Sequence, residues 1–199
     1  MTPSSFSLIN QGIGSKRFYP NKLVNKGTGE NYGVELTVER FYVKSFFFMY
    51  TCSIYNSVYK GSDGIERSTD FNGTYAMNFL AGKTIKIGDK KSIELGIKII
   101  YDGGRRYTPI DQAASKVARE DIYIESLRNT LRFKPYSRLD FKIDYKINSA
   151  KLTHEIGLDL INILSTKNIF SISYSTTTNS IVENYQLGFL PIFYYKLDF

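Results

Sequence analysis

The sequence predicts an all-β fold: an antiparallel sheet of about seven long strands, with the character of a transmembrane β-barrel segment that does not close. Three observations predict it. Apolar residues recur at every second position over most of the chain, which is the period of a strand with two different faces. The amphipathic runs hold roughly 9 to 13 residues, whereas a mean globular strand has about 5–6 and a tilted membrane strand needs about 9–11. Short and long connections alternate between the runs, as they do in outer-membrane barrels.

The seven predicted strands share this alternation of apolar and polar residues. They lie at 31–40, 45–55, 73–83, 92–101, 138–147, 154–162 and 188–199. The clearest is RLDFKIDYKI at 138–147, where apolar residues hold one face and charges of alternating sign hold the other. In a barrel the charged face would line a wet lumen and the apolar face would meet lipid. The alternation along each strand assigns eight charged residues to the lumen, where we expect them to hydrogen-bond across strands. They are Glu35, Glu39, Glu94, Lys98, Asp140, Lys142, Asp144 and Asp159.

The connections predict the direction of each strand. Those near 43–45, 87–91 and 148–151 are tight, and those near 59–70, 102–134 and 164–184 are long. Since outer-membrane barrels have short turns inside and long loops outside, the last strand runs inward. Counting back over seven strands, the first also runs inward, so residues 1–30 form an external loop and 31–199 hold the membrane strands. A complete single-chain barrel has an even number of strands. Either one more strand lies in the first thirty residues, or the chain is the carboxy-terminal part of a longer barrel.

Composition weighs against several other classes of protein. The chain has 199 residues, 16 Tyr, 14 Phe and no Trp, and no apolar run of about 20 residues that would span a bilayer as a helix. The formal net charge is +7, but the basic residues are spread along the chain among carboxylates, so we expect no nucleic-acid partner. The amino-terminal residues lack the basic patch and apolar core of a signal peptide. Cys52 is the single cysteine, which excludes an internal disulfide.

The local motifs predict neither an enzyme nor a cofactor. KGTGENYG contains Gly27, Gly29 and Gly33 but has the wrong spacing for a dinucleotide fingerprint, and a strand is expected after it in place of a helix. His154 is the one histidine, so a zinc-binding helix with two histidines is excluded. No Ser, His and Asp set has the arrangement of a catalytic triad. We therefore expect no catalytic, cofactor or metal site.

The most distinctive loop is GGRRYTPID at 103–111. Its two glycines permit positive φ, and its paired arginines could hold a carboxylate or phosphate group. Arg105, Arg106 and Tyr107 are thus candidates for contact with an external ligand or lipopolysaccharide; the alternative is a loop packed on the barrel rim. In GSDG, Asp63 precedes a glycine and predicts a turn. A single carboxylate there is a weak cation ligand.

Segments along nearly the whole chain, from about residue 4 to 199, resemble one family. They are NKGTGENYGVELTVERF, YKGSDGIERSTDFNGTY, GGRRYTPID, RLDFKIDYKIN, THEIGLDLINI and YQLGFLPIFYYKLDF. Together they resemble the carboxy-terminal barrel region of TonB-dependent outer-membrane receptors, especially the Bacteroidetes type with a carboxypeptidase-regulatory-like amino-terminal domain. In such receptors a barrel of about 22 strands surrounds a plug, and energy for nutrient uptake comes through TonB, which pulls on a short box near the amino terminus.

The resemblance implies a bacterial outer-membrane location and a barrel portion without plug or TonB box, hence without transport of its own. It implies lipid, lipopolysaccharide, the barrel-assembly machinery and the rest of the receptor as partners, and TonB only through that missing part. It also implies a role for the final strand, whose aromatic end resembles the segment that the assembly machinery reads. The matching positions are Gly188, Tyr195, Leu197 and Phe199.

Two other functions stay open. The chain could be a small stand-alone outer-membrane barrel of porin or adhesin type, with an eighth strand within 6–24. It could also be a soluble lipocalin-like module, with the apolar faces turned inward around a ligand. The position of the apolar faces separates this last alternative from the membrane alternatives.

Overall fold

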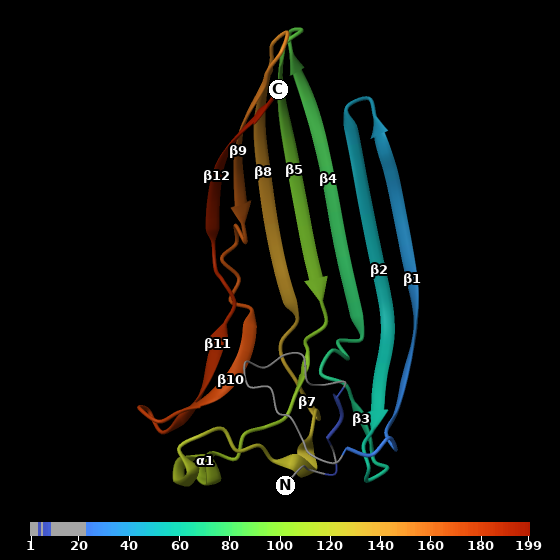
Figure 1. The fold of residues 1–199 in the computed structure, drawn as a ribbon, viewed down its shortest axis with the longest axis vertical. Helices are drawn as coiled ribbons and strands as arrows, with labels where there is room; N and C mark the ends of the chain where they lie inside the picture. The colour runs from blue at the N-terminus through green and yellow to red at the C-terminus, as the bar shows by residue number, and fades with distance from the viewer. Residues whose placement is uncertain (1–3, 5, 9–22) are drawn as a thin grey trace.

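A computed structural model describes residues 4, 6–8 and 23–199. Its centre is one antiparallel sheet in which seven long strands follow the order β1-β2-β4-β5-β8-β9-β12 (Figure 1). The strands are β1 (Thr28–Val43), β2 (Phe46–Lys60), β4 (Tyr75–Ile87), β5 (Lys91–Asp102), β8 (Tyr136–Asn148), β9 (Thr153–Ile161) and β12 (Leu190–Asp198). All seven predicted strands are therefore confirmed, and several begin or end a few residues outside the predicted bounds.

Tight turns join the strands in pairs at one end of the sheet, which is called the turn end below. Lys44 and Ser45 connect β1 to β2 with φ of 52° and 64°, the left-handed geometry of a two-residue hairpin. Gly88, at φ 68°, forms the turn from β4 to β5, where a residue without Cβ adopts positive φ at no steric cost. Ser149 closes the turn from β8 to β9, because its backbone N–H donates to the Leu152 carbonyl.

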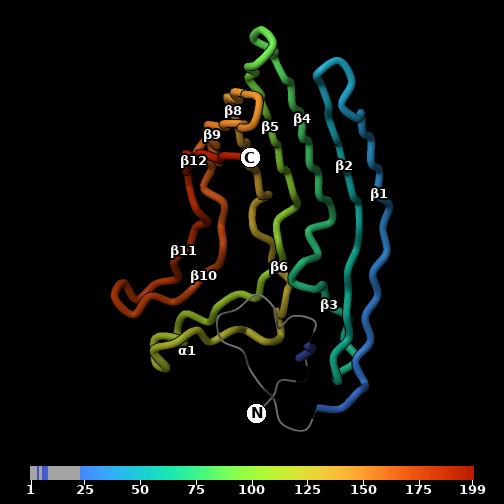
Figure 2. Tube along the Cα trace, turned by 45° about the horizontal axis from the view of Figure 1, so that its top comes forward, coloured from blue at the N-terminus to red at the C-terminus, as the bar shows by residue number. Residues whose placement is uncertain are grey.

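The opposite end, called the loop end below, carries short elements inside the long connections (Figures 1 and 2). The sequence periodicity did not predict them. They are β3 (Glu66–Ser68), β6 (Arg106–Tyr107), α1 (Gln112–Ala118), η2 (Glu125–Leu127), β7 (Leu131–Arg132), β10 (Ile169–Ser175) and β11 (Ser180–Tyr185). β3 pairs with β2, β6 with β7, and β10 with β11. The three long connections are thus folded segments, and they lie at the same end of the sheet.

The sheet does not close. Among the described residues, β1 pairs along its length with β2 alone, and β12 with β9 alone. The unclosed all-β fold is as predicted. The additional strand considered for 6–24 lies largely outside the described residues, and 6–8 and 23–24 are not in strands. Most of the external loop proposed for 1–30 lies outside them as well, and β1 already begins at Thr28.

Register gives the sheet one continuous apolar face. Leu36 pairs with Cys52, Cys52 with Met77 and Met77 with Tyr101, so one row of apolar side chains crosses four strands. A second row crosses the other half of the sheet, from Leu95 through Ile143 and Leu158 to Phe193. The face built from such rows is called the apolar face, and the opposite one the polar face.

Within the described residues, no layer packs on the apolar face. Val34 is 76% exposed, Ile54 63% and Phe193 77%. In the described part of the chain, the buried apolar side chains are Tyr59, Ala81, Ile110 and Tyr174. Three of these lie in or next to the loop-end segments, away from the middle of the sheet. An ordinary soluble domain would gather its apolar strand residues into one core, and this sheet does not.

Candidate functional site

The polar face is covered by a network of ion pairs that crosses β5, β8 and β9. Lys142 lies 3.2 Å from Asp144 and 3.9 Å from Asp159, and Lys146 lies 3.1 Å from Glu94 and 3.5 Å from Glu155. Neighbouring strands therefore present opposite charges to each other, an arrangement that stabilises a sheet. Asp144 is only 1% exposed, so this carboxylate is shielded from solvent, whereas the Lys142 side chain that pairs with it is 44% exposed.

The other predicted lumen residues also lie on the polar face. Arg138 pairs with Asp140 at 2.9 Å, and Asp140 accepts a hydrogen bond from the Asn162 backbone N–H at 2.9 Å. Glu35, Glu39 and Lys98 lie on the same face by register, and within the described residues they form no ion pair.

Tyr194 of β12 ties the last strand to this network. Its hydroxyl lies 2.6 Å from Asp144 and 2.8 Å from Glu155, so it donates to a carboxylate on either side. Its ring lies 5.1 Å from the Lys142 ammonium, as in a cation–π contact. Gly157 of β9 pairs with Asp144 on one neighbouring strand and with Tyr194 on the other. It leaves room for the Tyr194 ring to reach Asp144, because a Cβ at Gly157 would overlap that ring.

Replacing Gly157 with Ala should displace Tyr194 and lower the free energy of unfolding by about 1–2 kcal/mol. The lost hydrogen bonds to charged groups contribute about 1.5–3 kcal/mol. Alanine offsets part of this loss, because it reduces the conformational entropy of the unfolded chain. Urea titration in detergent micelles measures the change. In a Tyr194→Phe background, where the hydroxyl is already absent, Gly157→Ala should cost clearly less. Equal costs in both backgrounds would show that Gly157 does not act through Tyr194.

A pocket of about 400 Å³ opens where the polar face meets the loop end. Asn78 and Asp102 come to it from the strands, and Arg105 and Lys134 from the connection between β5 and β8. Asn168 holds the wall in place, since its side-chain amide donates to the Ser137 carbonyl and accepts from the Ser137 N–H, at 2.8 and 3.0 Å. Two cations and one carboxylate among amide groups suit a ligand with an anionic group and further polar groups.

The structure separates the three residues proposed as an external contact. Arg105 lines the pocket, with its guanidinium donating to the Phe170 carbonyl and lying 5.8 Å from the Phe170 ring. Burial lowers the pKa of Arg105 from its ordinary value, and Asp70 opposes that shift. Arg106 and Tyr107 form β6 and do not line the pocket; the Tyr107 ring stacks on Phe133 at 4.2 Å. The two arginines therefore do not share one surface site.

The glycines of this loop have a different role from the predicted one. Neither Gly103 nor Gly104 adopts positive φ. A Cβ on Gly103 would overlap the carbonyl oxygen of Gly73, and one on Gly104 the carbonyl oxygen of Phe133. These positions exclude a side chain because backbones approach each other closely, which periodicity along one segment cannot reveal.

Buried polar residues hold the loop-end segments together. The Asn129 amide donates to Asp70 at 2.7 Å and to the Ser68 carbonyl at 2.9 Å, which links the connection after β5 to the one after β2. Burial raises the pKa of Asp70, and the hydrogen bond from Asn129 opposes that shift. Asp121 accepts a hydrogen bond from the backbone N–H of Tyr174 at 2.6 Å, which joins β10 to the same layer. The loops thus form a linked cap over the pocket end of the sheet.

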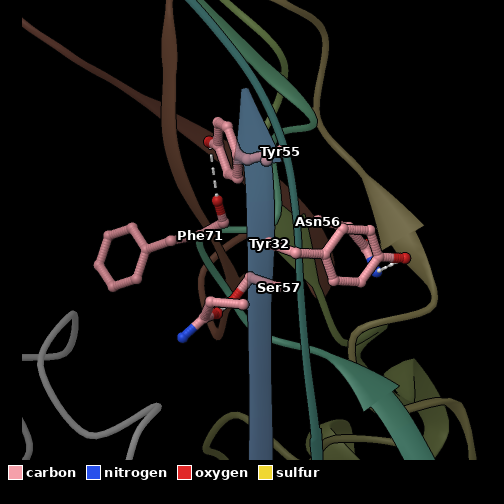
Figure 3. Close-up of a pocket in the computed structure, with 7 residues that line it drawn as sticks. Tyr32, Tyr55, Asn56, Ser57 and Phe71 are labelled. Atoms are coloured by element: carbon pink, nitrogen blue, oxygen red, sulfur yellow. Dashed lines mark hydrogen bonds between the residues drawn. The ribbon is translucent and has the colours of Figure 1, made fainter. Parts of the chain in front are cut away.

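A second hollow of about 430 Å³ lies along edge strand β1 (Figure 3). Tyr55 and Phe71 flank it on one side of the sheet, and the Tyr55 hydroxyl donates to the Phe71 carbonyl at 3.0 Å. Tyr32 and Asn56 point to the opposite side of β1, where the Asn56 amide donates to the Tyr32 hydroxyl at 3.1 Å. Gly33 lines the hollow at a point where a Cβ would overlap the Ile54 carbonyl oxygen and the Tyr55 backbone, and none of the lining residues is charged.

Asp63 and His154, which stand out in the sequence, have hydrogen-bonding partners in the structure. Asp63 forms a two-bonded ion pair with Arg67, at 2.9 and 2.8 Å, and the Arg67 guanidinium lowers the pKa of Asp63. That carboxylate is therefore already used by a cation of the protein itself. His154 Nδ1 lies 2.7 Å from the Tyr195 hydroxyl at the turn end. Cys52 is a free thiol on the apolar face.

The glycine-rich segment at 27–33 lies within β1 from Thr28 onward, and no helix follows it. Within the described residues, no His, Cys, Asp or Glu side chains gather in threes as a metal site would require. None of the helices in that part of the chain is both long enough and apolar enough to cross a membrane.

The fold and its site define a class of structure: an open antiparallel sheet with an uncovered apolar face, a charged face and a folded cap at one end. Comparisons with protein-family models, with curated proteins and with solved structures found no match to this chain.

Proposed function

We propose that this chain is the carboxy-terminal barrel portion of a TonB-dependent outer-membrane receptor for nutrient uptake, and that it supplies wall, external loops and the final strand. The observation that carries the proposal is the inverted burial of the two faces. Large apolar side chains such as Val34, Ile54 and Phe193 are exposed on one face, while the Asp144 carboxylate on the other face is 1% exposed. Lipid is the solvent in which such an apolar face is stable.

The dimensions of the apolar face support a bilayer. On β5 it runs from Ile93 to Tyr101, which are separated by eight steps of about 3.3 Å, or about 26 Å before tilt is considered. The apolar band of outer-membrane barrels is about 25 Å tall. Aromatic side chains lie at both of its borders: Tyr75 contacts Tyr101 at the loop end, at 5.7 Å between ring centroids, and His154 contacts Tyr195 at the turn end.

The free edges of β1 and β12 support a place within a larger barrel. An exposed edge strand of 16 residues is a liability for a soluble protein, and in a barrel both edges would be paired by further strands. A small stand-alone barrel would need to pair the same two edges with each other or with one added strand. A lipocalin-like module is disfavoured, because its apolar side chains would line a closed interior.

The single cysteine allows a direct test. With an environment-sensitive fluorophore on Cys52, the chain in lipid vesicles should show blue-shifted emission and quenching by a quencher attached to the lipid chains, since Cys52 lies on the apolar face. A matched control carries the fluorophore on the next residue, as Cys52→Ser with Ser53→Cys. Ser53 faces the polar side, so this label should be quenched by aqueous iodide instead.

The label at position 52 should be quenched from the lipid and the label at position 53 from water, although the two residues are adjacent on one strand. Equal quenching of both by iodide, or a chain that stays soluble and monodisperse in the presence of vesicles, would contradict the proposal. Exchange of the two patterns would place the polar face toward lipid, which would contradict it as well.

A further inference from the structure

The turn end of the sheet carries a row of basic side chains. We call this row the basic rim; its members are Arg40, Lys44, Lys83, Lys90, Lys91 and Lys151. All six are exposed. Within the described residues none of them forms an ion pair, and the acidic residue in the adjoining turns is Asp89.

Register places half of the basic rim on the apolar face itself. Arg40 pairs with Phe48, Lys83 with Phe46 and Lys91 with Ile87. These cations thus share a face with the apolar rows and lie at their border, close to the tight turns.

The contacts of these side chains direct their charges toward the turn end. The Lys83 ammonium donates to the Lys44 carbonyl in the turn between β1 and β2, at 3.3 Å. The Arg40 guanidinium lies 5.7 Å from the centroid of the Phe46 ring. The stems of both side chains cover apolar surface while their charges reach the rim, as amphipathic side chains do at a membrane border.

Adjacent turns hold the other cations close to these. The backbone N–H of Asn148 donates to the Lys90 carbonyl at 2.7 Å, and the N–H of Thr84 donates to the Ser45 carbonyl at 2.8 Å. The turn between β4 and β5 thus contacts the turn between β8 and β9, while the turn between β1 and β2 contacts β4 a few residues before its end. All three turns lie at one end of the sheet (Figure 1), and the cations follow the border of the apolar face there.

In the part of the chain that the structure describes, the loop end of the same face carries different side chains at its border. Tyr32, Tyr75 and Tyr101 border the apolar rows there. Beyond these tyrosines the face carries Glu30, and Lys60 is paired with Glu66 at 3.5 Å. The apolar face is thus electrically asymmetric, with unpaired cations at one border and uncharged aromatic side chains at the other.

We propose that the basic rim binds the phosphate headgroups of anionic phospholipids in the membrane leaflet at the turn end. This inference rests on the proposed function, since it requires the apolar face to lie in a bilayer. Cations at the edge of an apolar surface are placed where headgroup phosphates meet the acyl chains. Each basic side chain near an anionic membrane surface adds to the attraction, over about one Debye length. A nucleic acid offers phosphates but no apolar phase for the adjoining face.

The test compares two kinds of vesicle: phosphatidylcholine alone, and phosphatidylcholine mixed with phosphatidylglycerol. The full chain should partition more strongly into the anionic vesicles at low salt, and high salt should remove the preference. The triple variant Arg40→Gln, Lys83→Gln and Lys91→Gln should lose about fivefold per cation, or about a hundredfold in all, on anionic vesicles only. The matched control is Lys60→Gln, Lys116→Gln and Lys167→Gln, which removes the same charge from the loop end and should keep most of the preference.

The outcomes separate this inference from the proposed function. Equal partitioning of the unaltered chain into both vesicles, or equal losses in the two triple variants, would overturn the role of the basic rim and leave the membrane proposal standing. Failure to partition into either vesicle would overturn the membrane proposal itself. Circular dichroism in micelles reveals whether a triple variant folds. Where it does not, the three substitutions are made singly, and each should cost about fivefold on anionic vesicles only.

Discussion

Replacing Asp144 with Asn is expected to lower the free energy of unfolding by about 2 kcal/mol, as measured by urea titration in micelles or vesicles. Asp144 is 1% exposed, pairs with Lys142 at 3.2 Å and accepts from the Tyr194 hydroxyl at 2.6 Å. Breaking a fully buried ion pair costs about 3–5 kcal/mol. The Lys142 side chain is 44% exposed, so water solvates the cation left behind and the expected cost is smaller.

Asp159→Asn is the matched control for this prediction. Asp159 contacts the same lysine, but at 3.9 Å and with a side chain that is 34% exposed. The same loss of charge there should cost no more than about 1 kcal/mol. Equal losses at the two positions would show that the sum of charges, and not the shielded position of Asp144, stabilises the sheet. Tyr194→Phe removes one partner of Asp144, so the effects of Tyr194→Phe and Asp144→Asn should not be additive. In the variant with both changes, the loss in free energy of unfolding should differ from the sum of the two single losses by at least about 0.5 kcal/mol.

Under the proposed function, Leu36→Arg is expected to destabilise the chain in vesicles by about 2–4 kcal/mol, the cost of an arginine on a lipid-facing surface near the bilayer midplane. Leu36 is 55% exposed, lies in the row with Cys52 and Met77, and is midway between Tyr32 and Arg40 at the two borders of the apolar face. Its neighbour Thr37 lies on the polar face, opposite Thr51. Thr37→Arg, one residue away on the same strand, should change the stability by no more than about 0.5 kcal/mol.

The comparison must be made in vesicles, because the medium decides the result. In water without lipid, an arginine on an already exposed apolar face would be neutral or favourable. A loss of stability for Leu36→Arg in vesicles, together with its absence in water, would identify lipid as the solvent of this face. Equal effects of Leu36→Arg and Thr37→Arg in vesicles would contradict the assignment of the two faces.

The strands and their faces could be read from the sequence alone. Alternation with a period of two is a local property, and in RLDFKIDYKI it determines which side chains share a face before any partner strand is known. The tight turns were equally readable, since two or three residues between amphipathic runs leave room only for a hairpin. From these followed the strand order, the segregation of loops to one end and the unclosed edges that the structure shows.

Only the tertiary structure decided which distant residues meet. The placement of Tyr194 over Gly157 and against Asp144 depends on the pairing of β12 with β9 and of β9 with β8. The separation of Arg105 from Arg106 depends on how three long connections pack together, with backbones too close for a side chain at Gly103 and Gly104. Sequence alone determined the amphipathic strands and their two faces, because each such run carries its own pattern. The pocket, the ion-pair network and the folded cap needed the structure, because they arise from contacts between segments far apart in the chain.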